Sequence, residues 1–185
     1  VAVLGQAMDT LDCTGKVVAE KPWSHVTMED LEGVLDKFRG KIQQVPPMYS
    51  ALKKDGKKLY ELAREGQEVE REAREVEIYE LKLIMSGPPE NKAEPPDGGQ
   101  HEVLEGSWEA GSVPLALPRF GLEVQCSGGT YIRSLIADIA EEMGTCAHMT
   151  HLERTQQGPF SIKDCIYKSK WDFENICNAI KSLDE

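Results

Sequence analysis

The sequence lacks several features that would place it in other classes of protein. No apolar run approaches the roughly 18 residues that a membrane-spanning helix needs, and we see no signal peptide that would indicate secretion. The five cysteines include no CxxC pair, so we expect reduced thiols. There is no Gly-rich phosphate loop of the P-loop or Rossmann type and no GxSxG elbow. We therefore expect neither membrane insertion nor a cofactor site.

Metal ligands are also scarce. The stretch CAHMTH combines Cys146, His148 and His151 and could be offered as a metal site. A structural zinc site needs four converging ligands, and no second Cys/His pair stands elsewhere in the sequence to complete a tetrahedron. We favour an apolar stretch with two incidental imidazoles, and expect no metal.

Positive charge is low overall but concentrated in one region. The net charge is −11, which argues against nucleic acid at first sight. Residues 37–64, however, hold eight Lys/Arg against two acidic residues, while residues 86–118 hold six acidic residues against one lysine. The distribution of charge matters more than its sum. A basic run is more often a solvated face than an RNA site, and composition leaves both alternatives open.

The spacing of apolar residues predicts one α+β domain, with a mixed or antiparallel sheet and packed helices. A helix is predicted over 27–39, capped by Thr27 with Asp30, and a second over 131–143, ended by Gly144. A short helix with Leu59 and Leu62 inward should end at Gly66. Strands are predicted at 1–5, 16–22, 76–85 and 120–126, followed by two short strands around a Gly-Pro turn in 151–162.

Side-chain alternation within the strands predicts which residues face the core. In the strand 76–85, we expect Tyr79, Leu81, Leu83 and Met85 to share one face. In the strand 120–126, Phe120, Leu122, Val124 and Cys126 should share one side. Residues 6–15 are predicted to form a turn or loop, and residues 41–56 an extended segment and a loop.

The stretch between those two strands has a composition of its own. Residues 86–118 hold six of the ten prolines of the chain, and they cannot bury enough apolar surface to offset their ordering entropy. We expect a flexible acidic insertion that joins two paired strands, with Trp108 as the one residue that could dock.

Three groups of side chains are candidates for chemistry. Arg133 lies in the first turn of a predicted helix, where the macrodipole disfavours a cation, so its guanidinium wants an anion. An ordinary exposed arginine is an equally good interpretation of the spacing. Asp9 and Asp12 could be general acid/base residues or metal ligands, although turn aspartates usually bond their own backbone. Tyr49 and Tyr60 stand among four lysines, Lys53, Lys54, Lys57 and Lys58, a mixture suited to RNA.

Three blocks, taken in order, resemble the TruB-type pseudouridine synthases, and most of all the eukaryotic members. These blocks are LGQAMDTLDCTGKV, IQQVPPMYSALKKDGKKLYELAREGQEVEREAREVEIYEL and CSGGTYIRSLIADIAEEMGTCAHMTHLERTQQGPF. The resemblance implies the pseudouridine synthase fold and the isomerisation of a uridine in the T-arm loop of tRNA, without cofactor or metal. The target base would be flipped out, and an aspartate would break the glycosidic bond before the uracil rejoins the ribose through carbon.

The resemblance also implies roles for individual residues. Arg133 in GTYIRS matches the arginine that pairs with the catalytic aspartate, and Leu152 in HLERT matches an apolar residue that lines the pocket of the target base. Asp9 in MDTLD matches an aspartate that contacts flipped-out bases. Tyr49, Lys53 and Lys57 fall in a block that lies near the RNA in the family.

The sequence departs from the family pattern in places. The family's nucleophile lies in a GTLDP-like motif, and no such string occurs here. We therefore expect a catalytic domain that is incomplete at its N-terminus, inactive alone and poorly folded alone. Met8 stands where many members have threonine. The acidic insertion 86–118 is longer than the short turn of the family, and we expect this insertion to point away from the RNA.

These features lead to a set of expectations about organisation and partners. Residues 1–170 should form the partial catalytic domain, interrupted by 86–118, and residues 171–185 a helical tail. We expect a monomer that binds the T-arm of tRNA, with mRNA as a further candidate, and no membrane. The location would be intracellular, with nucleus, cytosol and mitochondrion all open. The alternative function is a non-catalytic RNA-binding or RNA-folding module of the same fold.

Overall fold

A computed structural model describes residues 1–87, 113–166 and 168–181. The chain divides into two compact units, Val1–His151 and Leu152–Glu185, and each is described by itself.

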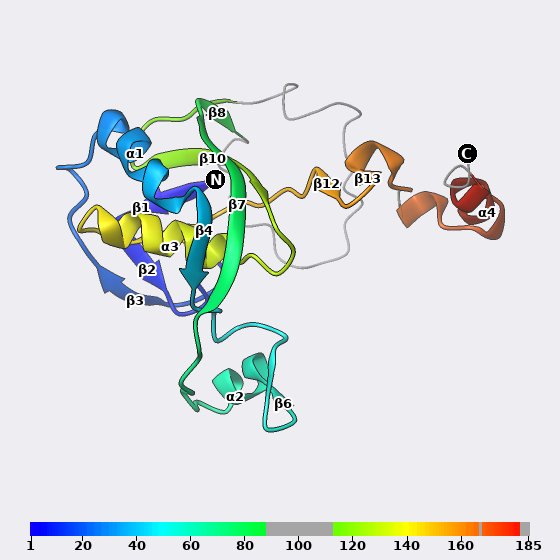
Figure 1. Ribbon diagram of the computed structural model, residues 1–185, viewed down its shortest axis with the longest axis horizontal. Helices are drawn as coiled ribbons and strands as arrows, with labels where there is room; N and C mark the ends of the chain where they lie inside the picture. The colour runs from blue at the N-terminus through cyan, green and yellow to red at the C-terminus, as the bar shows by residue number, and fades with distance from the viewer. Residues whose placement is uncertain (88–112, 167, 182–185) are drawn as a thin grey trace. The chain divides into compact units, whose positions relative to one another are not determined.

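The first unit is built on a five-stranded sheet (Figure 1). All neighbouring strands of this sheet are antiparallel. The α+β prediction is therefore confirmed, with an antiparallel rather than a mixed sheet. In their order across the sheet, the strands are β11 (Ala147–Met149), β1 (Ala2–Leu4), β10 (Arg119–Cys126), β7 (Arg74–Ile84) and β4 (Gly40–Gln44).

Two predicted helices pack against this sheet. The helix α1 (Met28–Leu35) begins as predicted: Thr27 Oγ1 accepts from the Asp30 amide at 3.1 Å, and the Asp30 carboxylate accepts from the Thr27 amide at 3.0 Å. The 3₁₀ turn η1 (Asp36–Phe38) continues it to two residues before Gly40. The helix α3 (Ile132–Glu142) is followed by Gly144 at φ 75°, a conformation that favours glycine.

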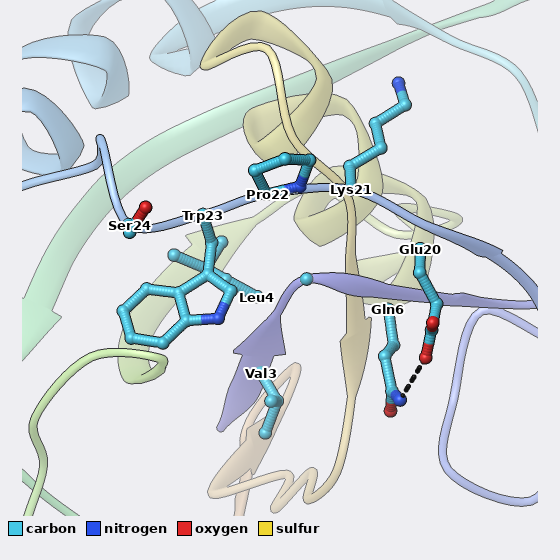
Figure 2. Close-up of a pocket in the computed structure, with 9 residues that line it drawn as sticks. Val3, Leu4, Gln6, Glu20, Lys21, Pro22, Trp23 and Ser24 are labelled. Carbon is cyan, nitrogen blue, oxygen red and sulfur yellow. Dashed lines mark hydrogen bonds between the residues drawn. The ribbon is translucent and has the colours of Figure 1, made fainter.

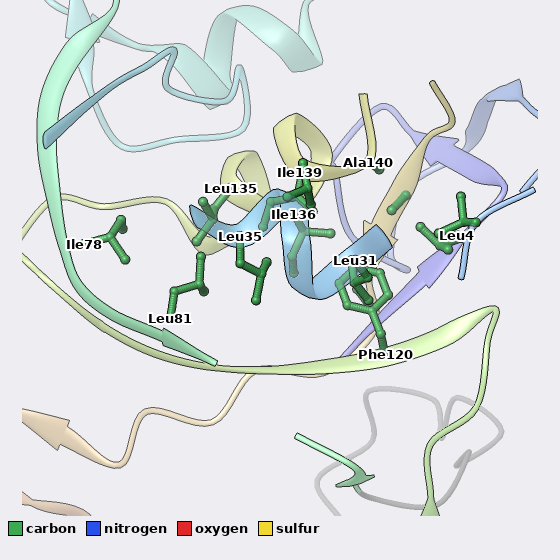
Figure 3. Packing of buried hydrophobic residues seen from close by; sticks show 14 residues of the cluster. Leu4, Leu31, Leu35, Ile78, Leu81, Phe120, Leu135, Ile136, Ile139 and Ala140 are labelled. Atoms are coloured by element: carbon green, nitrogen blue, oxygen red, sulfur yellow. The ribbon is translucent and has the colours of Figure 1, made fainter. Parts of the chain in front are cut away.

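The core lies between these helices and the sheet, and Figure 3 shows β7 and β10 curving around it. Both helices contribute side chains at helical spacing, as the sequence predicts. The same burial confirms that Phe120 faces the core, with Leu122, Val124 and Cys126 of β10 packed against it. The largest fully buried apolar side chains are Leu31 and Leu35 of α1, Leu135 and Ile139 of α3, Ile78 and Leu81 of β7, and Phe120.

The predicted face of β7 is wrong at both of its ends. Tyr79 and Met85 are exposed, whereas Ile78 and Leu81 are both fully buried. A bulge accounts for Tyr79: Ile78 pairs with Cys126 and Glu80 pairs with Gln125, so Tyr79 is an extra residue in the ladder. Met85 lies beyond the end of β7. An extra residue reverses the alternation beyond it. Alternation within the strand alone cannot reveal such a bulge.

Two segments predicted as loops contain strands. Residues 6–15 begin with β2 (Gln6–Met8), which pairs with β3 (Val17–Glu20), the predicted strand before Pro22. Residues 53–58 form the hairpin of β5 (Lys53–Lys54) and β6 (Lys57–Lys58). Its turn residues Asp55 and Gly56 have φ 51° and 83°. Asp-Gly is the favoured pair for a two-residue hairpin, so a usable signal was present. The short predicted helix follows as α2 (Leu59–Arg64).

The two strands that flank the acidic insertion, β7 and β10, do pair with each other, as predicted. Beyond them, β8 (Ser86–Gly87) pairs with β9 (Val113–Pro114), and Leu115 is buried. The remaining prediction for the insertion, including Trp108, lies outside the described residues.

The second unit contains short elements. The predicted strands around the Gly-Pro turn are β12 (Gln156–Gln157) and β13 (Phe160–Ser161), and they pair antiparallel. The 3₁₀ turns η2 (Ile162–Asp164) and η3 (Lys168–Lys170) precede α4 (Phe173–Lys181), which confirms a helix in the tail. Within the described parts of the chain, the helices are all too short or too polar to cross a membrane.

Candidate functional site

Arg133 stands in the first turn of α3 and has the anionic partner that its position requires. Its Nη1 donates to Asp12 Oδ2 and to the Thr10 carbonyl oxygen, both at 2.9 Å. Its Nη2 donates to the Tyr49 carbonyl oxygen at 2.8 Å. The Arg133 and Asp12 side chains are only 22% and 19% exposed. We call this group the Arg133 centre: Arg133, Asp12, and the carbonyl groups of Thr10 and Tyr49.

The Asp12 carboxylate is bonded on both oxygens. Oδ1 accepts from the Thr10 hydroxyl at 2.9 Å, from the Thr14 amide at 3.1 Å and from the Thr14 hydroxyl, while Oδ2 accepts from Arg133. Burial alone would raise the pKa of Asp12, but the bonds from Thr14 and Thr10 and the charge of Arg133 outweigh it. The pKa is therefore held below its ordinary value of 3.8, and the carboxylate is ionised at neutral pH.

The loop that carries Asp12 is fixed by its own backbone. Leu11 adopts φ 61°, and its carbonyl oxygen accepts from the Met149 amide of β11 at 3.0 Å. A Cβ on Gly15 would lie 2.2 Å from Asp9 Oδ1 and 2.3 Å from Thr10 Oγ1, so a larger residue there would force these side chains to shift. The loop thus places Asp12 next to a helix that begins far along the sequence.

The segment 44–50 lies on the other side of the Arg133 centre. The Gln44 side chain bonds both backbone groups of Tyr131: its Oε1 accepts from the amide at 2.8 Å, and its Nε2 donates to the carbonyl oxygen at 3.1 Å. Ser134 Oγ donates to the Val45 carbonyl oxygen at 3.1 Å. Together with the bond from Arg133 to Tyr49, these contacts join three residues of the α3 N-terminus to one extended segment.

The hairpin β5–β6 carries lysines directly opposite one another. Lys53 pairs with Lys58 and Lys54 with Lys57, and like charges at such positions destabilise a hairpin. Figure 1 shows β6 and α2 beyond the end of β4, away from the sheet. We call Lys53, Lys54, Lys57 and Lys58 the lysine hairpin.

One aromatic ring stands beside these lysines. Lys58 Nζ lies 5.3 Å and Arg64 Cζ 5.4 Å from the centre of the Tyr60 ring. A hydrogen bond to the Tyr60 hydroxyl raises the pKa of Lys58. The cations and the ring are therefore held together on the surface, an arrangement suited to phosphates and bases.

A pocket of about 600 Å³ lies elsewhere in the first unit, along β1 and β3. Figure 2 shows the Trp23 ring extending toward the strand that bears Val3 and Leu4. None of the residues predicted for the site lines this pocket. In the part of the chain that the structure describes, no cluster of three or more His, Cys, Asp or Glu could hold a metal ion.

Comparison with known families decides the identity of the chain. Residues 1–94 match the TruB family pseudouridylate synthase N-terminal domain. Residues 133–181 match the tRNA pseudouridylate synthase B C-terminal domain. The chain belongs to the TruB family. The resemblance predicted from the three sequence blocks is thus confirmed.

TruB-family relatives match the chain over nearly its whole length. The human pseudouridylate synthase TRUB1 is 40% identical over 98% of this chain and 44% of its own length. The tRNA pseudouridine synthase B of Geotalea uraniireducens is 42% identical over 92% of this chain and 46% of its own length. That of Listeria welshimeri is 42% identical over 97% of this chain and 52% of its own length. The chain spans about half the length of these relatives.

The structure brings two of the predicted site residues into contact and shows the local setting of the others. Arg133 and Tyr49 meet, but through the Tyr49 carbonyl group and not its ring. Asp9 is exposed and its Oδ1 accepts from the Lys16 amide at 2.8 Å, as a turn aspartate does. Lys53 is exposed on β5. Leu152 belongs to the second unit and is 51% exposed.

The sequence analysis did not predict two of the contacts around Arg133 and the start of α3. Asp12 was weighed as a turn aspartate, yet it is the carboxylate that pairs with Arg133. The sequence analysis assigned no role to Gln44, although its side chain is 2% exposed and hydrogen-bonded at both Oε1 and Nε2. Both partnerships join residues far apart in sequence, and no local spacing signals them.

Proposed function

We propose that the protein containing these residues is a tRNA pseudouridine synthase that isomerises a uridine of the T-arm loop. Membership of the TruB family supports the reaction class. The observation that carries the proposal is the Arg133 centre, in which a poorly exposed guanidinium is fixed by Asp12 and two carbonyl groups. Arginine in such a setting holds a carboxylate ionised and in place. We propose that Arg133 holds a second carboxylate in the same way, that of the aspartate nucleophile.

Asp12 itself is a poor nucleophile because its oxygens already accept four hydrogen bonds. We therefore assign it the role of orienting Arg133. The three bonds of the guanidinium to described residues leave further N–H donors for a second carboxylate. We propose that the nucleophilic aspartate comes from outside the 185 residues, and that these residues alone are inactive.

The RNA would be held by other parts of the first unit. In the lysine hairpin, lysines stand opposite one another on paired strands, so their charges repel. Phosphates of the RNA would reduce this repulsion. We assign Lys53 and Lys57 to phosphate contacts, and Tyr49 and Asp9 to contacts near the flipped bases. Leu152 would line the pocket of the target base. The proposed substrate is the T-arm of tRNA, with mRNA as a further candidate, and the proposed acting species is a monomer without cofactor or metal.

The experiment is a pseudouridine assay on a T-arm minihelix. It compares the 185-residue chain with a longer protein extended at its N-terminus. We expect product only with the longer protein, and a loss of product when Arg133 is replaced by lysine. Pseudouridine formed by the 185 residues alone would refute the outside nucleophile.

A non-catalytic RNA-binding module is the second candidate, and the lysine hairpin favours it equally, since cations bind RNA whether or not chemistry follows. A longer protein that binds the minihelix but forms no pseudouridine would move the conclusion to this function.

A further inference from the structure

Gln44 is a buried polar residue at the end of strand β4. Its side chain is 2% exposed, and its amide bonds the amide and the carbonyl group of Tyr131 at 2.8 and 3.1 Å. Burying an amide in this way is unfavourable unless its hydrogen bonds are made. Here both polar atoms of the side chain are bonded, and both bonds go to the backbone of one residue of another element.

That residue stands at the start of α3. Tyr131 is the N-cap residue, and no side chain caps this helix locally. Gln44 therefore supplies, from β4, an acceptor for the Tyr131 amide, which a helix start otherwise leaves unpaired. It also adds a second donor to the Tyr131 carbonyl oxygen, which already accepts from the Leu135 amide at 3.0 Å. Arg133 follows only two residues later, in the same turn. Any tilt of this turn would displace the guanidinium relative to Asp12 and to the anion it serves.

Two further bonds join the start of α3 to the segment 44–50, so the two segments meet at several residues. Ser134 binds the Val45 carbonyl oxygen, and Arg133 binds that of Tyr49. Of the contacts made by Gln44, Ser134 and Arg133, only that of Gln44 engages both a donor and an acceptor of the α3 backbone. It therefore sets direction as well as distance.

We infer that Gln44 is a positioning residue for the pseudouridine synthase reaction, acting through the first turn of α3 on Arg133. This inference rests on the proposed function. A displacement of about 1 Å at a catalytic group can lower a rate on the order of 10²-fold. Gln44 touches no substrate, and its effect lies in the rate of the chemical step and not in RNA affinity.

The experiment replaces Gln44 by methionine, which has a similar shape but makes neither bond, in the longer protein. We measure the single-turnover rate at saturating T-arm minihelix, the Kd for the same RNA, and Tm. We expect the rate to fall by about 10- to 100-fold, with Kd within about twofold of the wild type. A rate within about threefold of the wild type would overturn the inference.

The matched control is Thr27→Ala, which removes the cap of α1 and leaves α3 untouched. Both substitutions should lower Tm by a few degrees, about 2–6 °C. Only Gln44→Met should slow the chemical step. An equal loss of rate in the Thr27 variant would show that lowered stability, not misplacement, is responsible.

A second substitution covers the case in which Gln44→Met does not fold. Gln44→Glu keeps an acceptor for the Tyr131 amide but cannot donate to the Tyr131 carbonyl group when ionised. The same rate, Kd and Tm are measured. Failure of both variants to fold would overturn the positioning role in favour of a folding role.

The outcomes separate this inference from the function on which it rests. If the wild-type longer protein forms no pseudouridine, the proposed function fails. If the wild type is active, Arg133→Lys is slow and Gln44→Met keeps the wild-type rate, only the positioning role of Gln44 fails.

Discussion

The Arg133 centre and the lysine hairpin treat positive charge in opposite ways. Arg133 is mostly buried, and its donors meet a carboxylate and two carbonyl groups at 2.8–2.9 Å. In the hairpin, Lys53 stands opposite Lys58, and Lys54 opposite Lys57. Some of these lysines have outside partners, such as Glu65 for Lys57, but within the ladder like charge faces like charge.

The difference indicates two uses of a cation. Matched charges inside a fold fix geometry, which a chemical step needs. Exposed and mutually repelling cations add little to folding, but they gain free energy when phosphates replace their counterions. Each prediction below changes one side of this comparison and leaves the other intact.

The largest expected effect is on the matched side. Arg133→Lys keeps the charge but cannot hold Asp12 and two carbonyl groups with one planar group. In the longer protein we expect the single-turnover rate to fall on the order of 10²-fold or more, with RNA affinity nearly unchanged. The assay is pseudouridine formation in a T-arm minihelix.

Arg39→Lys provides the control. Arg39 also donates to a carbonyl group, that of Leu81, and pairs with Asp36. Neither of these partners belongs to the Arg133 centre. The same substitution there should leave the rate of pseudouridine formation unchanged. Equal losses in both variants would mean that the Arg133 centre has no special role.

The second effect is on stability and its dependence on pH. Asp12→Asn keeps the acceptor for Thr14 but can turn an amide donor toward Arg133, so we expect a loss of about 2 kcal/mol in the free energy of unfolding at pH 7. The folded-state pKa of Asp12 lies below 3.8. Its ionised form therefore stabilises the fold above that pH, and the contribution is lost as pH falls through the folded-state pKa.

Urea unfolding of both proteins at several pH values measures this difference. The gap between the wild type and Asp12→Asn should narrow below about pH 4. A gap that stays constant from pH 7 to pH 3 would show that the Asp12 charge does not stabilise the centre.

The third effect is on RNA binding by the lysine hairpin. Lys53→Glu places an acid opposite Lys58, so the hairpin should gain a few tenths of a kcal/mol, about 0.2–0.5. RNA binding should weaken by about tenfold at 0.1 M salt, with a shallower salt dependence. Filter binding at several salt concentrations tests both. Lys82→Glu makes the same charge change on β7, and a loss of equal size there would reduce the effect to net charge.

The sequence predicts the elements whose signals are local and misses contacts that depend on distant partners. The capping partners Thr27 and Asp30 are only three residues apart, and this cap was predicted. An anionic partner for Arg133 was one of two equal interpretations of its place in a helix, and the family resemblance favoured it. Which aspartate meets it depends on the turn of a loop 121 residues away. Likewise, the bulge at Tyr79 depends on the register with β10, and the role of Gln44 on a backbone 87 residues away.

The smallest expected effect concerns Asp138 on α3, an acid that has no matched cation among the residues that the structure describes. Burial, with a smaller contribution from the Glu141 charge, raises the pKa of Asp138 to about 6, from an ordinary value of 3.8. The folded state therefore holds its proton more tightly than the unfolded state, so stability is lost as pH rises from about 4 to 6. Because the carboxyl group is only partly buried, solvent screening limits this loss to about 1 kcal/mol.

Asp138→Asn should recover that loss by removing the charge with little change of shape. At pH 7.5 we expect Tm to rise by about 2–4 °C, and the advantage to disappear below pH 4, where the wild-type carboxyl group is protonated. The sign is opposite to that of Asp12→Asn, although both replace aspartate by asparagine. Thermal melts of the two variants at pH 7.5 and 4 measure this contrast. A destabilised Asp138→Asn at pH 7.5 would mean that Asp138, like Asp12, has a cationic partner in the folded protein.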